Sequence, residues 1–305
     1  MGLRLALAVC LGLGLGPVPA RAQPADRAAL TAKAKAGDAG AMYALANSLT
    51  VAGAQAGRKA TPAELAEALD WFKKAAAGGD VDAMFQLEMI YSGGDRGAAR
   101  NPADARRWRE RAFTSGTGQN LFDEGQRQAF PDGDAKPNPT EAARWFQAAA
   151  NKGHAEAMLE LGYLMYRGDG LKRDRAQGMA WLDKAVKAQP RNPAFLDQRC
   201  LARMQAGVQL DLALADCEAA VVLAPAKTTY VQTRALTQLK RGAFAEAERD
   251  FAAAKAKDHS PYSGYGRGLA LLKAGKTAEG RAELAEASAQ DPSIRKTFAD
   301  MGLKP

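Results

Sequence analysis

Apolar and small residues recur along most of the chain with the period of an α-helix. From residue 38 onward, alanine, leucine and aromatic side chains return every three or four positions, which places them on one helical face. Turn residues separate these runs. Thr61-Pro62-Ala63-Glu64 has the form of a helix start, with an N-cap threonine, proline at the first helical position and glutamate three residues later. The pattern predicts an all-α chain of short helices joined by turns, with no strand signal.

The four tryptophans mark a longer repeat within this pattern. Trp71, Trp108, Trp145 and Trp181 follow one another at intervals of 37, 37 and 36 residues. Each has a small residue three positions before it and an alanine four positions after it, so one helical face holds both. A period of this length indicates stacked repeats. The small flanking residues favour tryptophans that fill the core over tryptophans that form an exposed stacking surface.

The residues around these tryptophans resemble a known repeat. Ala157, Leu161-Gly162, Gly168-Asp169-Gly170 and then Trp181 form the clearest copy, and this pattern resembles the Sel-one-like repeat, a helix-turn-helix unit related to the tetratricopeptide repeat. The resemblance covers residues 38–190 in four copies. It is poorest in the first helix of the third copy, where Glu124-Gly125 stands at the position expected for leucine.

A shorter repeat without tryptophan continues over residues 191–292. Arg199-Cys200, Arg234-Ala235 and Arg267-Gly268 begin three aligned segments, each with a glycine seven residues after the small residue. The spacing of 33 to 35 residues and the small residues at helix crossings resemble the tetratricopeptide repeat. Together the two resemblances imply a right-handed α/α solenoid. The expected segments are a signal peptide (1–22), an N-terminal cap helix (23–37), four Sel-one-like repeats (38–190), three tetratricopeptide-like repeats (191–292) and a C-terminal capping helix (293–305).

The N-terminus has the pattern of a secretory signal peptide. Arg4 precedes an apolar run from Leu5 to Gly16, and Ala20-Arg21-Ala22 supplies a small-residue cleavage site. We therefore expect cleavage after Ala22 and export to the bacterial periplasm. The formal net charge is +8 at pH 7. Charges of both signs are interleaved without long blocks, which is typical of solvated helix faces rather than of nucleic-acid binding. No later stretch is apolar enough to predict a membrane span.

Two cysteines, Cys200 and Cys217, remain after the predicted cleavage site. The repeat alignment puts them on facing positions of the two helices of one hairpin, and an exported chain enters an oxidising compartment. A disulfide is favoured, with two independent buried thiols as the alternative. A second cross-hairpin pattern accompanies it, because an acid follows each repeat arginine by 16 or 17 residues. The predicted structural ion pairs are Arg199–Asp216, Arg234–Asp250 and Arg267–Glu283.

Little in the sequence indicates catalysis. The two histidines, His154 and His259, have no histidine or cysteine at metal-ligand spacing. Gly168-Asp169-Gly170 follows no strand and lacks the lysine of a phosphate-binding loop. We therefore expect no catalytic residue, no metal site and no cofactor.

The family resemblance implies a non-enzymatic scaffold that binds an extended peptide or protein on its concave face. Such a protein would be an interaction adaptor in the bacterial cell envelope. A binder of cell-wall glycan or exported polysaccharide is the alternative, and a nucleic-acid partner is not expected. Positions carried over from the tetratricopeptide repeat predict a partner-binding groove formed by Asp197, Gln232, Lys240, Tyr265 and Lys273.

Overall fold

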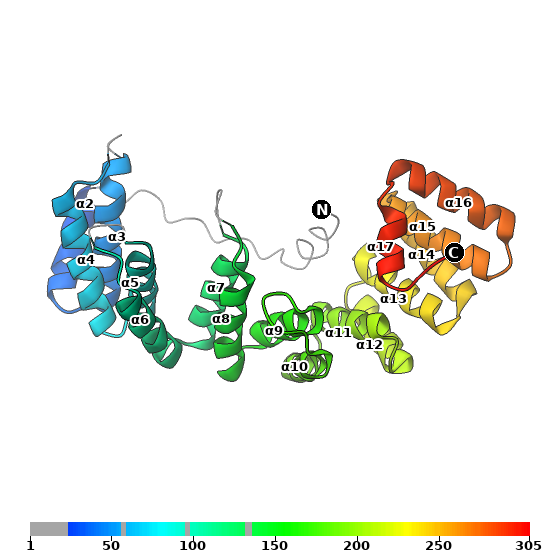
Figure 1. Cartoon of the computed structure of the whole chain (residues 1–305), viewed down its shortest axis with the longest axis horizontal. Helices are drawn as coiled ribbons and strands as arrows, with labels where there is room; N and C mark the ends of the chain where they lie inside the picture. Colours follow the sequence, from blue (N-terminus) through cyan, green and yellow to red (C-terminus); the bar gives the residue numbers. More distant parts are fainter. Residues whose placement is uncertain (1–23, 56–58, 95–97, 132–135) are drawn as a thin grey trace. The chain divides into compact units, whose positions relative to one another are not determined.

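The chain folds entirely into helices over the residues that the structure describes. A computed structural model describes residues 24–55, 59–94, 98–131 and 136–305, and these ranges contain sixteen α-helices and no strand (Figure 1). The predicted all-α solenoid class is therefore confirmed. The predicted signal peptide, residues 1–22, lies outside the described residues. Within the described ranges, no helix combines the length and the hydropathy that a membrane span requires.

The described residues divide into two compact units, 24–157 and 158–305. Each unit is built from consecutive helices that pair as antiparallel hairpins, and each hairpin packs on the next. The helices of the first unit are α2 (Pro24–Lys35), α3 (Ala39–Gln55), α4 (Pro62–Ala77), α5 (Val81–Gly93), α6 (Pro102–Ser115), α7 (Gly118–Ala129) and α8 (Pro139–Asn151).

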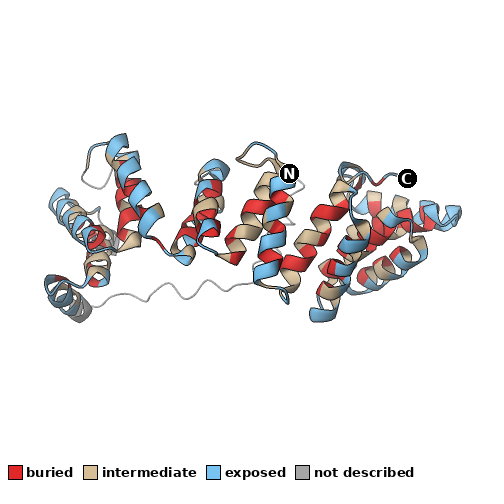
Figure 2. Ribbon diagram, turned by 90° about the horizontal axis from the view of Figure 1, so that it is seen from below, coloured by how far each residue is buried: buried red, intermediate tan, exposed pale blue. Residues whose placement is uncertain are grey.

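The second unit begins within the first turn of α9 (Ala155–Arg167). Its further helices are α10 (Arg175–Ala188), α11 (Pro193–Ala206), α12 (Leu210–Leu223), α13 (Thr228–Arg241), α14 (Phe244–Asp258), α15 (Pro261–Lys273), α16 (Thr277–Gln290) and α17 (Ile294–Asp300). In both units the buried residues form stripes along the facing sides of the helices (Figure 2).

Local sequence explains where the helices begin and end. Thr61 caps α4 through a complete capping box, in which its hydroxyl accepts from the Glu64 amide and the Glu64 carboxylate accepts from the Thr61 amide. The amides of a first helical turn lack carbonyl partners, so this cap satisfies them. At the other end of a helix, Gly94 terminates α5 in the left-handed conformation with φ 74°, which glycine adopts without steric cost.

The four tryptophans divide into two pairs. Trp108 and Trp145 are buried, at 9% and 2% exposure, as the sequence predicts. Trp71 and Trp181 are only partly buried, so their prediction as core residues is wrong in part. The residue that follows each of them takes the central position of the hairpin, and both of these residues are 0% exposed: Phe72 and Leu182. A lysine lies over each outer indole ring, Lys74 at 4.5 Å and Lys184 at 3.8 Å from the ring centroid.

The irregular first helix of the third repeat, α7, has a steric explanation. A Cβ at Gly125 would lie 2.6 Å from ring atoms of Phe146 on α8, so only glycine fits this crossing. The preceding Glu124 is 2% exposed and is paired with Arg127 at 2.7 Å and with the Gln128 amide at 2.7 Å. A bulky aromatic residue on the second helix thus replaces the leucine that is missing from the first.

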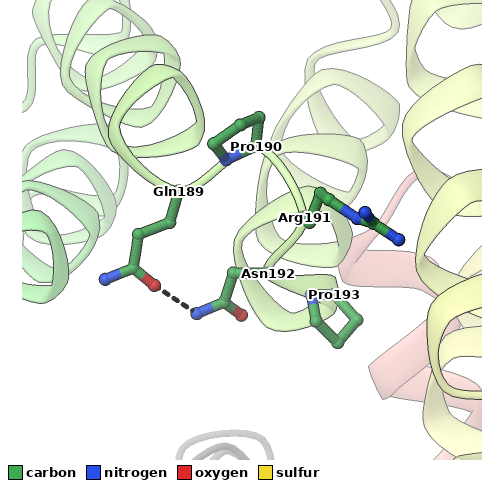
Figure 3. Close-up of a pocket in the computed structure, with 5 residues that line it drawn as sticks. All are labelled: Gln189, Pro190, Arg191, Asn192 and Pro193. Atoms are coloured by element: carbon green, nitrogen blue, oxygen red, sulfur yellow. Dashed lines mark hydrogen bonds between the residues drawn. The ribbon is translucent and has the colours of Figure 1, made fainter.

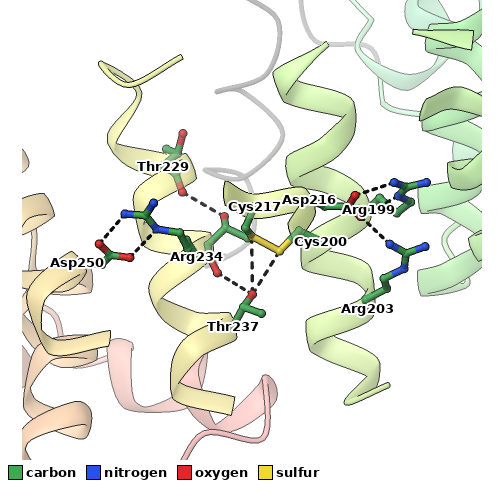
Figure 4. Close-up of a disulfide and its surroundings, with 10 residues drawn as sticks. Arg199, Cys200, Arg203, Asp216, Cys217, Thr229, Arg234, Thr237 and Asp250 are labelled. Atoms are coloured by element: carbon green, nitrogen blue, oxygen red, sulfur yellow. Dashed lines mark hydrogen bonds and ion pairs between the residues drawn. A yellow bond between two sulfur atoms is a disulfide. The ribbon is translucent and has the colours of Figure 1, made fainter. Parts of the chain in front are cut away.

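A disulfide and ion pairs link the helices of the second unit (Figure 4). Cys200 on α11 is joined to Cys217 on α12, with 5.6 Å between their Cα atoms, within the predicted range. The Thr237 hydroxyl on α13 lies 3.3 Å from the Cys200 sulfur and 3.7 Å from the Cys217 sulfur. The three predicted ion pairs are confirmed: Arg199–Asp216 at 2.6 Å, Arg234–Asp250 at 2.7 Å and Arg267–Glu283 at 2.6 Å.

Candidate functional site: the first-helix faces

We call the exposed sides of the first helices of successive hairpins the first-helix face of each unit. In the first unit it consists of α3, α5 and α7, and in the second unit of α11, α13 and α15. The contacts between α5 and α7, between α11 and α13, and between α13 and α15 show that these helices are neighbours. A segment bound to such a face touches several repeats at once.

Side chains from three hairpins interact electrostatically on the first-helix face of the first unit. Burial raises the pKa of the Tyr43 phenol on α3, while a hydrogen bond with Asn47 lowers it. The charges of Asp82 on α5 and Arg127 on α7 also act on this phenol. We refer to Tyr43, Asp82 and Arg127, which interact electrostatically from three hairpins, as one cluster.

Exposed apolar side chains accompany this cluster. Met89 is seven residues after Asp82 on α5, hence on the same side of that helix, and it is 45% exposed. Phe130 ends α7 three residues after Arg127 and is 49% exposed. The Arg127 guanidinium lies 5.5 Å from the ring centroid of Phe85. The face thus offers an acid, a base, a phenol and exposed apolar groups, a combination suited to a peptide with varied side chains.

The sequence did not identify this face. Its residues lie on first helices at positions opposite the alanine-rich core stripe, and they differ in chemical type from one repeat to the next. The only available signal was the spacing of Asp82 and Met89, seven residues apart on one side of a helix. That spacing is common to any solvated helix face, so it carries no functional meaning without the contacts.

The predicted groove of the second unit is only partly on the surface. Lys273 is exposed, and Lys240 is partly exposed. Gln232 is half-buried, and its amide donates to Asp258 at 2.7 Å and to Ser263 at 2.9 Å. Tyr265 and Asp197 are 1% and 5% exposed. As placed in this structure, these two side chains cannot reach a partner, which corrects their prediction as exposed groove residues.

Asp197 is an unusual buried acid. Burial raises its pKa to about 7, partly offset by a hydrogen bond with Thr233. Its Oδ1 atom has no hydrogen-bond partner, and a buried carboxylate without full hydrogen bonding is costly. The charge of Asp197 in turn contributes to raising the pKa of Tyr262 on α15, where burial is the larger cause. These contacts place Asp197, Thr233 and Tyr262 together beneath the face of the second unit.

A shallow hollow also lies at the turn between α10 and α11 (Figure 3). Gln189, Pro190, Arg191, Asn192 and Pro193 line it. The Asn192 side-chain amide donates to the Gln189 side-chain oxygen at 2.7 Å. Arg191 is its single ionisable side chain, so the hollow lacks the paired acid and base that hydrolytic chemistry needs.

One histidine lies in a ring stack and the other at the end of a helix. The His154 ring stacks on Phe122 with centroids 4.6 Å apart and 21° between the planes, and burial is the main cause that lowers its pKa. His259 ends α14 in the left-handed conformation with φ 49°. Among the described residues, no group of three or more His, Cys, Asp or Glu side chains is placed to hold a metal ion.

The fold and these faces define a class of helical-hairpin repeat proteins. The family model "Sel1 repeat" matches residues 39–80, 81–116, 125–154 and 155–189, so these four segments are similar to Sel1 repeats. The third match begins inside α7, which agrees with the irregular sequence of that helix. Repeats of this kind typically form non-enzymatic scaffolds that bind proteins.

Solved structures similar to the chain have low sequence identity. One is a protective antigen of uropathogenic Escherichia coli with an SLR fold, at 20% identity and TM-score 0.49, covering 91% of this chain and 61% of that chain. Another is a Sel1 repeat protein of Oxalobacter formigenes, at 18% identity and TM-score 0.38, covering 77% and 89%. A third is yeast Tom70, at 15% identity and TM-score 0.44, covering 91% and 58%. No curated protein matches the sequence.

Proposed function

We propose that the protein is an interaction scaffold of the bacterial cell envelope, which binds an extended segment of a protein partner along the first-helix face of its first unit. Two observations carry this proposal: the Arg127 guanidinium of α7 lies 5.5 Å from the Phe85 ring centroid of α5, and Asp82 and Arg127 both act electrostatically on Tyr43 of α3. A ligand that touches Tyr43, Asp82 and Arg127 must run across the repeats.

The chemistry of the face supports a peptide ligand. Peptides carry charged, polar and apolar groups at short intervals, and this face presents partners for each of them. Exposed Met89 is a flexible apolar side chain that adapts to differently shaped partners. The envelope setting is supported by the signal-like N-terminus and by the Cys200–Cys217 disulfide, since disulfides persist in oxidising compartments.

Capture from envelope extracts tests the proposal with two matched variants. Met89→Glu places a charge in the middle of the face. Arg106→Glu, on the second helix α6, also adds a carboxylate, at a site whose side chain is 75% exposed. Wild-type protein and Arg106→Glu should recover the same specific protein, and Met89→Glu should recover at least about tenfold less of it.

Equal recovery by all three proteins would overturn the assignment to this face. A parallel sedimentation assay with purified cell wall separates the alternative ligand class. Sedimentation with the wall, without recovery of a specific protein, would replace the peptide proposal by a glycan-binding one.

A further inference from the structure

The last helix of the second unit does not continue the stack. Within this unit, each of the first helices α13 and α15 packs closely on the second helix that precedes it, α12 and α14 respectively. Helix α17 instead contacts α15 more than α16, the helix directly before it. The chain therefore turns back after α16 and lays its C-terminal segment against the first helices.

Aromatic contacts fix this segment on α15. The Phe298 ring lies 4.8 Å from the ring of Tyr262 and 4.9 Å from the ring of Tyr265, measured between centroids. The Tyr262 hydroxyl lies 4.0 Å from the sulfur of Met301. Phe298 is 0% exposed, so it is the main anchor of the segment.

The segment also reaches the neighbouring first helices. Ile294, Phe298 and Leu303 belong to one buried cluster with residues of three first helices, among them Met204 of α11, Leu236 of α13 and Leu269 of α15, and with Phe251 of α14 and Ala287 of α16. Gly302 lies against Lys240 of α13, because a Cβ at Gly302 would be 3.2 Å from the Lys240 Nζ atom. Figure 1 shows α17 beside α15.

Two residues of the predicted groove, Tyr265 and Lys240, are therefore contacted by the C-terminal segment of the same chain. Ile294, Phe298 and Met301 are spaced i, i+4 and i+7 and share one side of a helix. This is the arrangement by which an amphipathic helix docks in a groove on a helical receptor. The segment thus occupies the position of a peptide ligand.

Local sequence does little to hold the segment in place. Helix α17 has seven residues, and Ser293 at its N-cap makes no side-chain capping hydrogen bond. Helices this short are not stable in isolation, so α17 depends on its apolar anchors. Those anchors must offset the conformational entropy of ordering the chain end, which makes release easier here than for an internal helix.

We propose that residues 294–305 are a displaceable intramolecular ligand of the first-helix face of the second unit. The partner that replaces them is a short amphipathic helix with an aliphatic residue, an aromatic residue and a thioether or aliphatic residue at i, i+4 and i+7. Free protein keeps Tyr262, Tyr265 and the apolar α13 side chains covered, and a partner that exchanges with the segment covers them again while Ile294 and Phe298 are released. This face is separate from the one assigned under the proposed function.

A labelled peptide of residues 291–305 tests the proposal on the full-length mature protein. Phe298→Ala in the protein weakens its own segment, and this variant should bind the peptide at least about tenfold more tightly than wild-type protein does. The same peptide carrying Phe298→Ala should not bind. Phe122→Ala is the matched control, because it truncates a phenylalanine of 7% exposure in the first unit and should bind as weakly as wild type.

A second variant tests the proposal without truncating a large buried side chain. Met301→Glu places a carboxylate beside Tyr262 at the edge of the contact and should give the same gain, with an unchanged far-UV circular dichroism spectrum. Folded Phe298→Ala and Met301→Glu proteins that bind no better than wild type would overturn the proposal. An equal gain in peptide affinity for the Phe122→Ala protein would overturn the proposal as well, because the gain would then reflect a general loosening of the fold.

This outcome is separable from that of the proposed function. Met89→Glu should leave binding of the 291–305 peptide unchanged, because Met89 lies in the other unit. Loss of peptide exchange with intact Met89-dependent capture rejects only the displaceable segment. Peptide exchange without capture of any envelope protein rejects only the proposed function.

Discussion

The contribution of the disulfide to stability follows from the length of the loop that it closes. Cys200 and Cys217 are separated by 17 residues. A cross-link over this length lowers the entropy of the unfolded chain by about 10 cal/mol/K, which corresponds to about 3 kcal/mol at 25 °C. Both sulfurs are 0% exposed, so replacing the cysteines by alanine adds a second cost from lost packing. We expect reduction of the wild-type protein to cost about 3 kcal/mol and the Cys200→Ala/Cys217→Ala variant to cost more.

Urea denaturation followed by far-UV circular dichroism measures both costs, with and without reductant. Trp71, Trp108 and Trp145 all lie in the first unit, so tryptophan fluorescence should respond less to the reductant than circular dichroism does. Reductant should leave the urea unfolding transition of the double-alanine variant unchanged. The reasoning is refuted if reduction leaves the wild-type transition where it was, or if the unfolded, unreduced mature protein titrates with two free thiols.

Two further substitutions probe the second unit. Burial raises the pKa of Asp197 to about 7, so folding favours the protonated form of this side chain. The resulting contribution to the free energy of unfolding is complete below the unfolded pKa near 4, and it is lost as pH rises through 7. Asp197→Asn should therefore raise the free energy of unfolding at pH 8 by more than at pH 5, and denaturation at the two pH values checks the difference. Gly266→Ala places a Cβ 2.4 Å from ring atoms of Phe251 and should cost about 1–3 kcal/mol; a melting temperature equal to that of wild type would contradict this expectation.

Several features were predictable because they depend on local spacing. The capping box at Thr61 is read directly from four consecutive residues, and the structure contains it in full. The cross-hairpin pairs, such as Arg234 with Asp250, follow from the fixed length of a helical hairpin. An offset of 16 or 17 residues brings the two side chains together whenever both helices form. The same geometry places Cys200 opposite Cys217.

The candidate sites were less predictable because they depend on which surfaces other segments cover. Tyr265 was expected in an open groove, since its repeat position faces away from the second helix. Phe298, 33 residues later, covers it. The apolar stripe of residues 294, 298 and 301 predicted a helix that packs on something, but its spacing is equally compatible with packing on α16 or on α15.

The sequence by itself determined the helical repeat, the helix ends and the contacts within each hairpin, because these interactions join residues within about one repeat of each other. The tertiary structure decided which first-helix residues remain open. Arg127 of α7 lies over the Phe85 ring of α5, and α17 turns back onto α15 rather than extending the stack. Such arrangements depend on packing between repeats. The apolar stripes of many helices are chemically alike, so only the fit of their side chains decides which helices pack together.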